Sequence, residues 1–185
     1  MDKLKIAVFL CLSLPFLVCG CKEHCSAFPE GQMVWFPAST KGSALTYSNG
    51  TETIRLLLDR IEKNDKYSFS KDCDCMCEYF AYEYFTSSGL DMYYSVNIYG
   101  DIVSMSIVMS DNGGDDRYGF KYNMSKNAYE YGPEPVGSLK VGNKTYYNVV
   151  LLKKRTGESD DLIYYSRGSG IIRFERGGEI WDLVE

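Results

Sequence analysis

The sequence predicts a mainly β protein (α+β minor), built as an antiparallel meander with one amphipathic helix. Aromatic residues are abundant, with 16 Tyr and 9 Phe, and these residue types favour the pleated, half-buried surface of a strand. Apolar and polar residues alternate over residues 92–110, which is the pattern of strands that bury one face. Turns that contain glycine then divide the last third of the chain into short segments, as in a meander.

Residues 1–20 have the pattern of a secretory signal peptide. A short basic head precedes an apolar run of 13 residues, Ile6–Val18, which is shorter than the about 20 residues that span a bilayer. Because the run ends on Val18-Cys19-Gly20-Cys21, it resembles the signal of a bacterial lipoprotein, whose cysteine thiol takes a diacylglycerol and becomes the mature N-terminus. The resemblance assigns lipidation to Cys21, with acyl chains such as palmitate, and a conventional secreted protein is the alternative.

Residues 21–48 are expected to form a tether that lifts the domain off the membrane. The segment is polar, is broken by Pro29 and Pro37 and shows little periodicity. Terminal segments of this kind stay poorly ordered unless they are tied down. Residues 49–185 are expected to form a single β-rich domain, because the chain beyond the signal has the length of one ordinary domain.

The one helix is predicted at about residues 51–64. Thr51 is suited to cap its N-terminus. Four apolar residues recur at i, i+3, i+4 and i+7, namely Ile54, Leu57, Leu58 and Ile61. This spacing places the four side chains on one face of a helix, which would cover one face of the sheet.

Strands are predicted from residue 92 onward by patterns of period two. A hairpin over residues 92–110 turns at Gly100-Asp101, and residues 118–124 continue the alternation. Pro133 and Pro135 mark a break, because proline does not fit a central strand. The meander is completed by segments 145–152, 162–166, 171–175 and 179–183, whose connecting glycines suit tight turns.

These last strands carry a second resemblance. The segments concerned are Tyr146-Tyr147-Asn148-Val149, Ile163-Tyr164-Tyr165-Ser166, Gly170-Ile171-Ile172-Arg173-Phe174 and Gly178-Glu179-Ile180-Trp181. Together with the signal ending at Cys21, they resemble small, mostly uncharacterised lipoproteins of Gram-negative bacteria. The resemblance implies a curved open sheet with a helix on its concave side, and it supplies no catalytic residues.

Four cysteines remain once Cys21 is lipidated: Cys25, Cys73, Cys75 and Cys77. They allow three connectivities, and export to an oxidising compartment favours at least one disulfide. Alternate residues of a strand lie about 6.6 Å apart, at the edge of disulfide reach, whereas Cys25 could pair with any member of the run. Free thiols are one alternative. A zinc or iron–sulfur site that includes His24 is another, although the usual C-x₂-C spacing is absent.

No catalytic constellation stands out. His24 is the only histidine and lies on the expected tether, where a nucleophile pair would be poorly preorganised. Residues 111–116 are rich in oxygen ligands but lack the ordered acidic spacing of a calcium loop, which predicts a solvated hairpin loop. Asn49, Asn123 and Asn143 begin glycosylation sequons, whose relevance the sequence leaves open. We expect no enzyme activity, no cofactor and no bound metal.

Charge and motifs together favour a lipid-anchored, non-enzymatic protein of the bacterial cell envelope. The formal charge is −5, and −6 without residues 1–20, which disfavours nucleic-acid binding. We therefore expect attachment to the outer membrane through the acyl chains on Cys21, facing the periplasm or the cell surface. The expected role is structural or is the binding of an unknown envelope protein or ligand.

Two other functions remain open. One is a carrier: Met92, Met105 and Met109 could line an apolar groove, or Tyr93 and Tyr99 on the polar face could capture a glycan. The other is a thiol or metal protein that uses the cluster Cys73–Cys77.

Overall fold

The structure is a computed structural model that describes residue 25 and residues 28–37, 40–69, 75–111, 114–154 and 161–184. These residues form twelve strands and one short 3₁₀ helix, η2 (Glu30–Trp35). The strands are β1 (Ala44–Ser48), β2 (Thr53–Phe69), β3 (Cys75–Thr86), β4 (Asp91–Tyr99), β5 (Ile102–Asp111), β6 (Gly114–Asn123), β7 (Ala128–Tyr131), β8 (Glu134–Val141), β9 (Lys144–Lys153), β10 (Leu162–Ser166), β11 (Gly170–Arg176) and β12 (Glu179–Val184).

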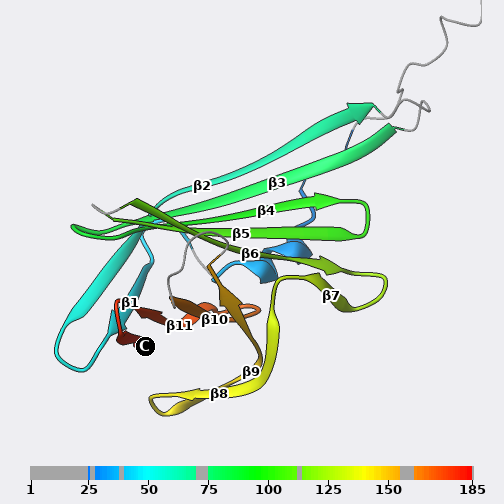
Figure 1. The fold of residues 1–185 in the computed structure, drawn as a ribbon. Coiled ribbons are helices and arrows are strands. Elements are labelled where there is room, and N and C mark those ends of the chain that lie inside the picture. Colours follow the sequence, from blue (N-terminus) through cyan, green and yellow to red (C-terminus); the bar gives the residue numbers. More distant parts are fainter. Residues whose placement is uncertain are drawn as a thin grey trace, which may run out of the picture.

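All twelve strands belong to one antiparallel sheet (Figure 1). From one edge to the other, the order is β7-β6-β5-β4-β3-β2-β1-β12-β11-β10-β9-β8. Neighbours in the sheet are neighbours in the chain, except that β1 pairs with β12 and so joins the two halves of the meander. The predicted mainly β, antiparallel meander is confirmed, including its four C-terminal strands.

The sheet curls until its two edges approach each other. β7 ends at Tyr131 and β8 begins at Glu134, so only two residues join opposite edges of the sheet. Three Cα–Cα steps of about 3.8 Å span about 11 Å at most. Gly132 fits this link because its φ is +104° and a Cβ atom there would lie 2.5 Å from the carbonyl oxygen of Gly119 on β6.

The inner face of the curl holds the hydrophobic core. Along β4 and β5, buried residues alternate with partly exposed ones, as the sequence predicts for residues 92–110. The segment around η2 lies against this inner face, where Trp35 is fully buried and its indole lies 5.7 Å from the ring of Phe120 and 5.0 Å from that of Tyr122. A short 3₁₀ helix thus packs inside the curl.

The prediction of an amphipathic helix at about residues 51–64 is wrong, because these residues belong to strand β2 and to the turn before it. A bulge between Leu58 and Arg60 changes the alternation of β2. As a result Leu58 before the bulge and Ile61 after it both pack against the core, although they are three residues apart. The bulge therefore imitates the spacing of a helix, whereas Leu57 is 45% exposed on the other face.

The turn before β2 uses the same chemistry as a helix N-terminus. The side-chain oxygen of Asn49 accepts hydrogen bonds from the backbone N–H groups of Thr51 and Glu52, at 2.9 and 2.7 Å. Such bonds satisfy free donors at a turn as well as at a helix start. The local sequence around Asn49 is therefore compatible with the start of a helix and with a turn before a strand. The strand forms because β2 pairs with β1 on one side and with β3 on the other.

Residues 21–48, expected to be a tether, contribute to the folded unit over the part that the structure describes. Phe28, Trp35 and Phe36 are buried, and Tyr47 of β1 is fully buried. β1 also lies in the middle of the sheet, between β2 and β12. The β-rich domain thus includes residues 28–37 and 40–48 and begins well before residue 49.

Tyrosine hydroxyls join distant parts of the chain inside the curl. Tyr47 donates to the carbonyl oxygen of Ile171 at 2.9 Å, and the Ile171 N–H donates to the hydroxyl of Tyr94 at 3.3 Å. The hydroxyl of Tyr165 donates to the carbonyl oxygen of Trp35. Burial raises the pKa of Tyr47, Tyr94 and Tyr165, so these hydroxyls stay protonated and act as uncharged partners.

An ion cluster joins β5 and β6 to the far side of the curl. Asp116 contacts Lys154 at 2.5 Å and Arg176 at 3.0 Å, and Arg176 also contacts Asp111 at 2.9 Å. The side chain of Asp116 is only 10% exposed. The prediction of a solvated loop at 111–116 therefore does not hold for Asp111 and Asp116, because both carboxylates pair with basic side chains of β11 or of the residue after β9.

Candidate functional site

A shallow groove lined by tyrosines lies on the outer face of the sheet, where β2, β3 and β4 run side by side. Its volume is about 390 Å³. We call it the tyrosine groove and define it by its lining residues Arg60, Glu62, Asn64, Tyr82, Tyr84 and Tyr93. The first three come from β2, the next two from β3 and the last from β4.

Strand register brings these side chains together. Arg60 lies opposite Tyr84 and Glu62 lies opposite Tyr82, while Tyr84 also lies opposite Tyr93. Side chains two residues apart on a strand share a face, so Tyr82 reaches Tyr93 on the diagonal. The bulge in β2 is part of this arrangement, because it sets which residues after position 59 point outward.

The three aromatic rings form a continuous surface. Tyr82 and Tyr93 are stacked, with ring centroids 5.7 Å apart and an angle of 21° between the planes. Tyr84 meets Tyr93 edge-on at 6.4 Å. The guanidinium carbon of Arg60 lies 5.9 Å from the centre of the Tyr84 ring, within the range of a cation–π contact.

The polar groups of the groove are fixed by their neighbours. The hydroxyl of Tyr84 donates to Asp91 at 3.0 Å, and this hydrogen bond raises the pKa of Tyr84. Arg60 and Glu62 form an exposed ion pair at 3.4 Å. Burial, assisted by Tyr82 and Glu62, raises the pKa of Tyr93 to about 12. At neutral pH the groove therefore offers the uncharged phenols of Tyr84 and Tyr93 beside the ion pair of Arg60 and Glu62.

Of the two tyrosines that the sequence places on the polar face, one lines the groove. Tyr93 and Tyr99 share a face of β4, but Tyr99 lies six residues further along, opposite Glu78 and Ile102. Tyr99 is 40% exposed and is outside the groove. Among the described residues, the structure thus brings Tyr93 together with Tyr82 and Tyr84 rather than with Tyr99.

Arg60, Glu62 and Asn64 could not be found by sequence reasoning, because the region was assigned to a helix. Tyr82 and Tyr84 were missed for a different reason. The run Tyr79-Phe80-Ala81-Tyr82-Glu83-Tyr84-Phe85 carries aromatics on both faces and shows no apolar alternation. Tyr82 and Tyr84 are two residues apart, and this spacing would have indicated that they share one face of a strand.

The three methionines that the sequence offers as a ligand-binding lining belong to the core. Met92, Met105 and Met109 are at most 1% exposed. They point inward from β4 and β5 into the cluster of buried residues that also contains Trp35 and Phe120. In the described part of the chain, these side chains therefore contact other core residues rather than solvent.

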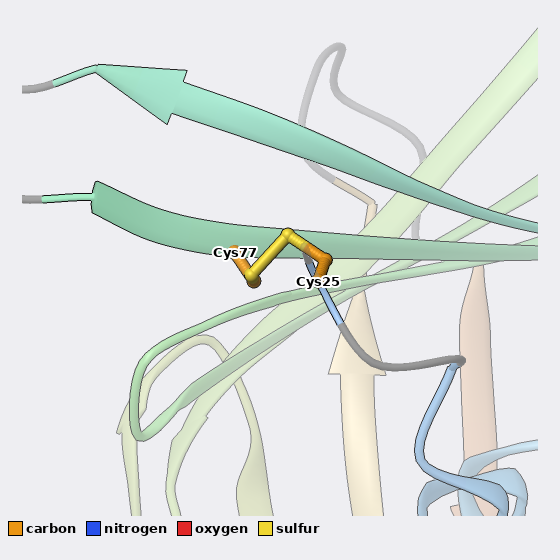
Figure 2. The surroundings of a disulfide bond; sticks show 2 residues. All are labelled: Cys25 and Cys77. Atoms are coloured by element: carbon orange, nitrogen blue, oxygen red, sulfur yellow. A yellow bond between two sulfur atoms is a disulfide. The ribbon is translucent and has the colours of Figure 1, made fainter. Parts of the chain in front are cut away.

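One cysteine pairing is present among the described residues. Cys25 and Cys77 form a disulfide, with a Cα–Cα distance of 5.6 Å (Figure 2). The bond connects the N-terminal segment to β3. Of the other residues in the predicted sulfur cluster, Cys75 starts β3, whereas Cys73 and His24 lie outside the described residues.

The remaining expectations concern lipid and metal. Cys21 lies outside the described residues. Within the described ranges, no three His, Cys, Asp or Glu side chains are grouped so as to hold a metal ion. Over the same ranges, no helix has the length and apolar character needed to cross a bilayer.

A second, larger groove is mostly apolar. It has a volume of about 510 Å³ and lies between the tip of the β8–β9 hairpin and β12. Its main apolar side chains are Val141, Tyr146 and Leu183. Val141 and Tyr146 are buried in a small cluster of their own, against which Leu183 packs, so this groove borders a packed region. The tyrosine groove, with its stacked rings and grouped polar ends, is the better candidate for a ligand site.

Known proteins give no further assignment of this site. No protein-family model, curated protein or solved structure matches the chain.

Proposed function

We propose that this protein is a lipid-anchored, non-enzymatic binding protein of the bacterial envelope, and that its tyrosine groove holds a glycan. The observation that carries the proposal is the stacked pair Tyr82–Tyr93 beside grouped polar side chains on the outer face. The signal pattern that ends at Cys21 supports a lipid anchor in the outer membrane.

A glycan fits the chemistry of the groove. A sugar ring has an apolar C–H face and a rim of hydroxyl groups, so it needs a flat apolar surface with polar groups at its border. The rings of Tyr82 and Tyr93 supply the surface, and Arg60, Glu62 and Asn64 supply donors and acceptors. The volume of about 390 Å³ falls within the range of small-ligand sites.

The groove favours binding over hydrolysis. Glycoside hydrolysis ordinarily uses a pair of carboxyl groups on either side of the scissile bond. Among the described residues that line the groove, Glu62 is the one carboxylate, and it is paired with Arg60. The raised pKa of Tyr93 also keeps its phenol protonated, which makes it a hydrogen-bond donor rather than a nucleophile.

Calorimetric titration with two soluble probes tests the proposal: a linear N-acetylglucosamine oligomer and a linear glucose oligomer. We expect saturable binding of at least one probe. Tyr93→Ala should weaken that binding about tenfold, because an aromatic contact contributes about 0.5–1.5 kcal/mol beyond its buried area. Tyr99→Ala is the matched control, since Tyr99 is on the same strand and face but outside the groove.

Two results would contradict glycan binding at this site. One is no saturable binding of either probe to a protein that is folded by circular dichroism. The other is an equal loss of affinity in the Tyr93→Ala and Tyr99→Ala variants.

The anchor is tested separately by the intact mass of protein extracted from membranes. We expect the mass of a chain that begins at Cys21 and carries acyl groups. Globomycin, which blocks the lipoprotein signal peptidase, should leave the signal uncleaved. Normal processing in the presence of the drug, or sugar on an asparagine in place of acyl groups, would contradict the anchor.

A further inference from the structure

The two longest strands form an arm that extends past the rest of the sheet (Figure 1). β3 pairs with β4 only from Glu78 onward, whereas its pairing with β2 continues to Cys75, which lies opposite Phe69. We define the β2–β3 arm as the overhanging residues 67–69 and 75–77. A two-stranded ribbon is marginally stable in water by itself, so the arm gains stability from a surface that it contacts.

The N-terminal segment runs along this hairpin in a defined direction. Three contacts tie it to the hairpin at successive levels: Cys25–Cys77, Phe28–Tyr79 and Glu30–Lys63. Since Lys63 lies opposite Ala81, the segment passes from the level of residue 77 to that of residue 81 of β3. From Glu30 back to Cys25, the segment therefore runs toward the end of the arm at residues 69 and 75.

Chain length then limits the distance between the arm and a lipid on Cys21. Cys25 follows Cys21 by four residues, and these four Cα–Cα steps span about 14 Å at most. The described part of the arm ends at Cys75, two residues or about 7 Å beyond Cys77. Each polar layer of a bilayer is about 5–8 Å thick. A domain held by so short a link has its arm at the level of the lipid headgroups.

We infer that the free end of the β2–β3 arm contacts the membrane surface and that the disulfide Cys25–Cys77 sets this orientation. The inference rests on the proposed acylation of Cys21. It places β3 upright on the membrane, with Tyr82 about 23 Å above the arm's end at the rise of an extended strand. The tyrosine groove then stands clear of the headgroups and is open to a glycan.

Tryptophan quenching in vesicles tests this orientation. The acylated protein is incorporated into phosphatidylethanolamine–phosphatidylglycerol vesicles whose lipids carry bromine near the headgroup. Tyr67→Trp places a probe on the arm, and Ser88→Trp places one just beyond the other end of β3, about 40 Å away. The emission of Trp35 and Trp181, measured in the parent protein, is subtracted.

We expect the bromolipids to remove most of the emission added by Tyr67→Trp and none of that added by Ser88→Trp. Equal quenching of both probes, or stronger quenching at position 88, would overturn the orientation. If Tyr67→Trp does not fold, Ser68→Trp on the same strand replaces it. Intact mass of the same sample separates the two proposals: acylated protein with an unquenched arm refutes the orientation alone, whereas unacylated protein refutes the anchor as well.

The role of the disulfide has its own test. In the variant Cys25→Ser/Cys77→Ser, the first contact among the described residues after Cys21 becomes Phe28–Tyr79, so the link lengthens from four Cα–Cα steps to seven. We expect quenching of the probe at position 67 to fall in this variant. Unchanged quenching would show that the disulfide does not set the orientation.

Discussion

Arg167 lies over the indole ring of Trp35, with its guanidinium carbon 4.3 Å from the ring centre. The turn after β10, which carries Arg167, is thereby attached to the η2 segment inside the curl. The backbone supports the same contact, because the Gly168 N–H donates to the carbonyl oxygen of Val34 at 2.7 Å. A residue near the C-terminus thus holds an N-terminal segment in place.

Arg167→Ala should lower the free energy of unfolding by about 0.5–1 kcal/mol, the size of an exposed cation–π contact. Arg167→Lys keeps a cation and should lose less. Urea denaturation measures both. Equal losses in the two variants would contradict a role for the charge alone and would show that the planar guanidinium is required.

Removal of the disulfide in Cys25→Ala/Cys77→Ala should cost about 2–4 kcal/mol, because the bond closes a loop with a sequence separation of 52. Urea denaturation of the oxidised parent and of the variant gives the difference. A reductant should destabilise the parent and leave the variant unchanged. An equally stable variant would mean that η2 holds the N-terminal segment without the bond.

Asp116→Asn should cost about 1.5–3 kcal/mol, since it removes the charge that pairs with Lys154 and Arg176 at a site that is 10% exposed. Asp115→Asn is the matched control, because Asp115 pairs with Arg117 on the surface and such pairs contribute about 0–1 kcal/mol. Thermal or urea unfolding compares them. Similar losses at positions 115 and 116 would contradict a stabilising cluster.

Gly132→Ala should destabilise the protein by about 1–3 kcal/mol, because the residue has positive φ and its Cβ atom would meet the Gly119 carbonyl oxygen. Gly31→Ala is the control, since nothing lies within 4 Å of its Cβ position and its φ is ordinary. The comparison of unfolding free energies tests whether the link between β7 and β8 is as tight as the structure indicates.

Stability should fall as the pH rises from about 10 to about 12. Burial raises the pKa of Tyr93 to about 12 and that of the interior tyrosines above the ordinary value of 10.0. The folded state therefore binds these protons more tightly than the unfolded chain, and stability that is complete below pH 10 is lost as they leave. Urea midpoints across this range, with tyrosinate absorbance, measure the effect. Midpoints that stay constant up to pH 12 would contradict it.

Much of the fold could be predicted where one local pattern decides it. The alternation over residues 92–110 leads to β4 and β5 with the expected buried face, and the turn at Gly100-Asp101 lies where its residues require it. Strands β10 to β12 follow their turns in the same way. In these segments the alternation along the strand is enough to predict which face of the sheet each side chain occupies.

β2 could not be predicted in this way, because its bulge gives a strand the apolar spacing of a helix. Sequence reasoning likewise placed Tyr93 on the polar face but could not give it Tyr82 and Tyr84 as neighbours, since register between strands brings them together. The pairing of Cys25 with Cys77 was one of several open possibilities for the same reason.

Sequence patterns were sufficient for the β class and for the buried faces of the regular strands, because these depend on residues close together in the chain. The curl, the pairing of β1 with β12, the disulfide and the tyrosine groove became known only from the folded arrangement. Each of these depends on contacts between residues far apart in the sequence. Such contacts form only when burial of the shared core brings the strands into one register.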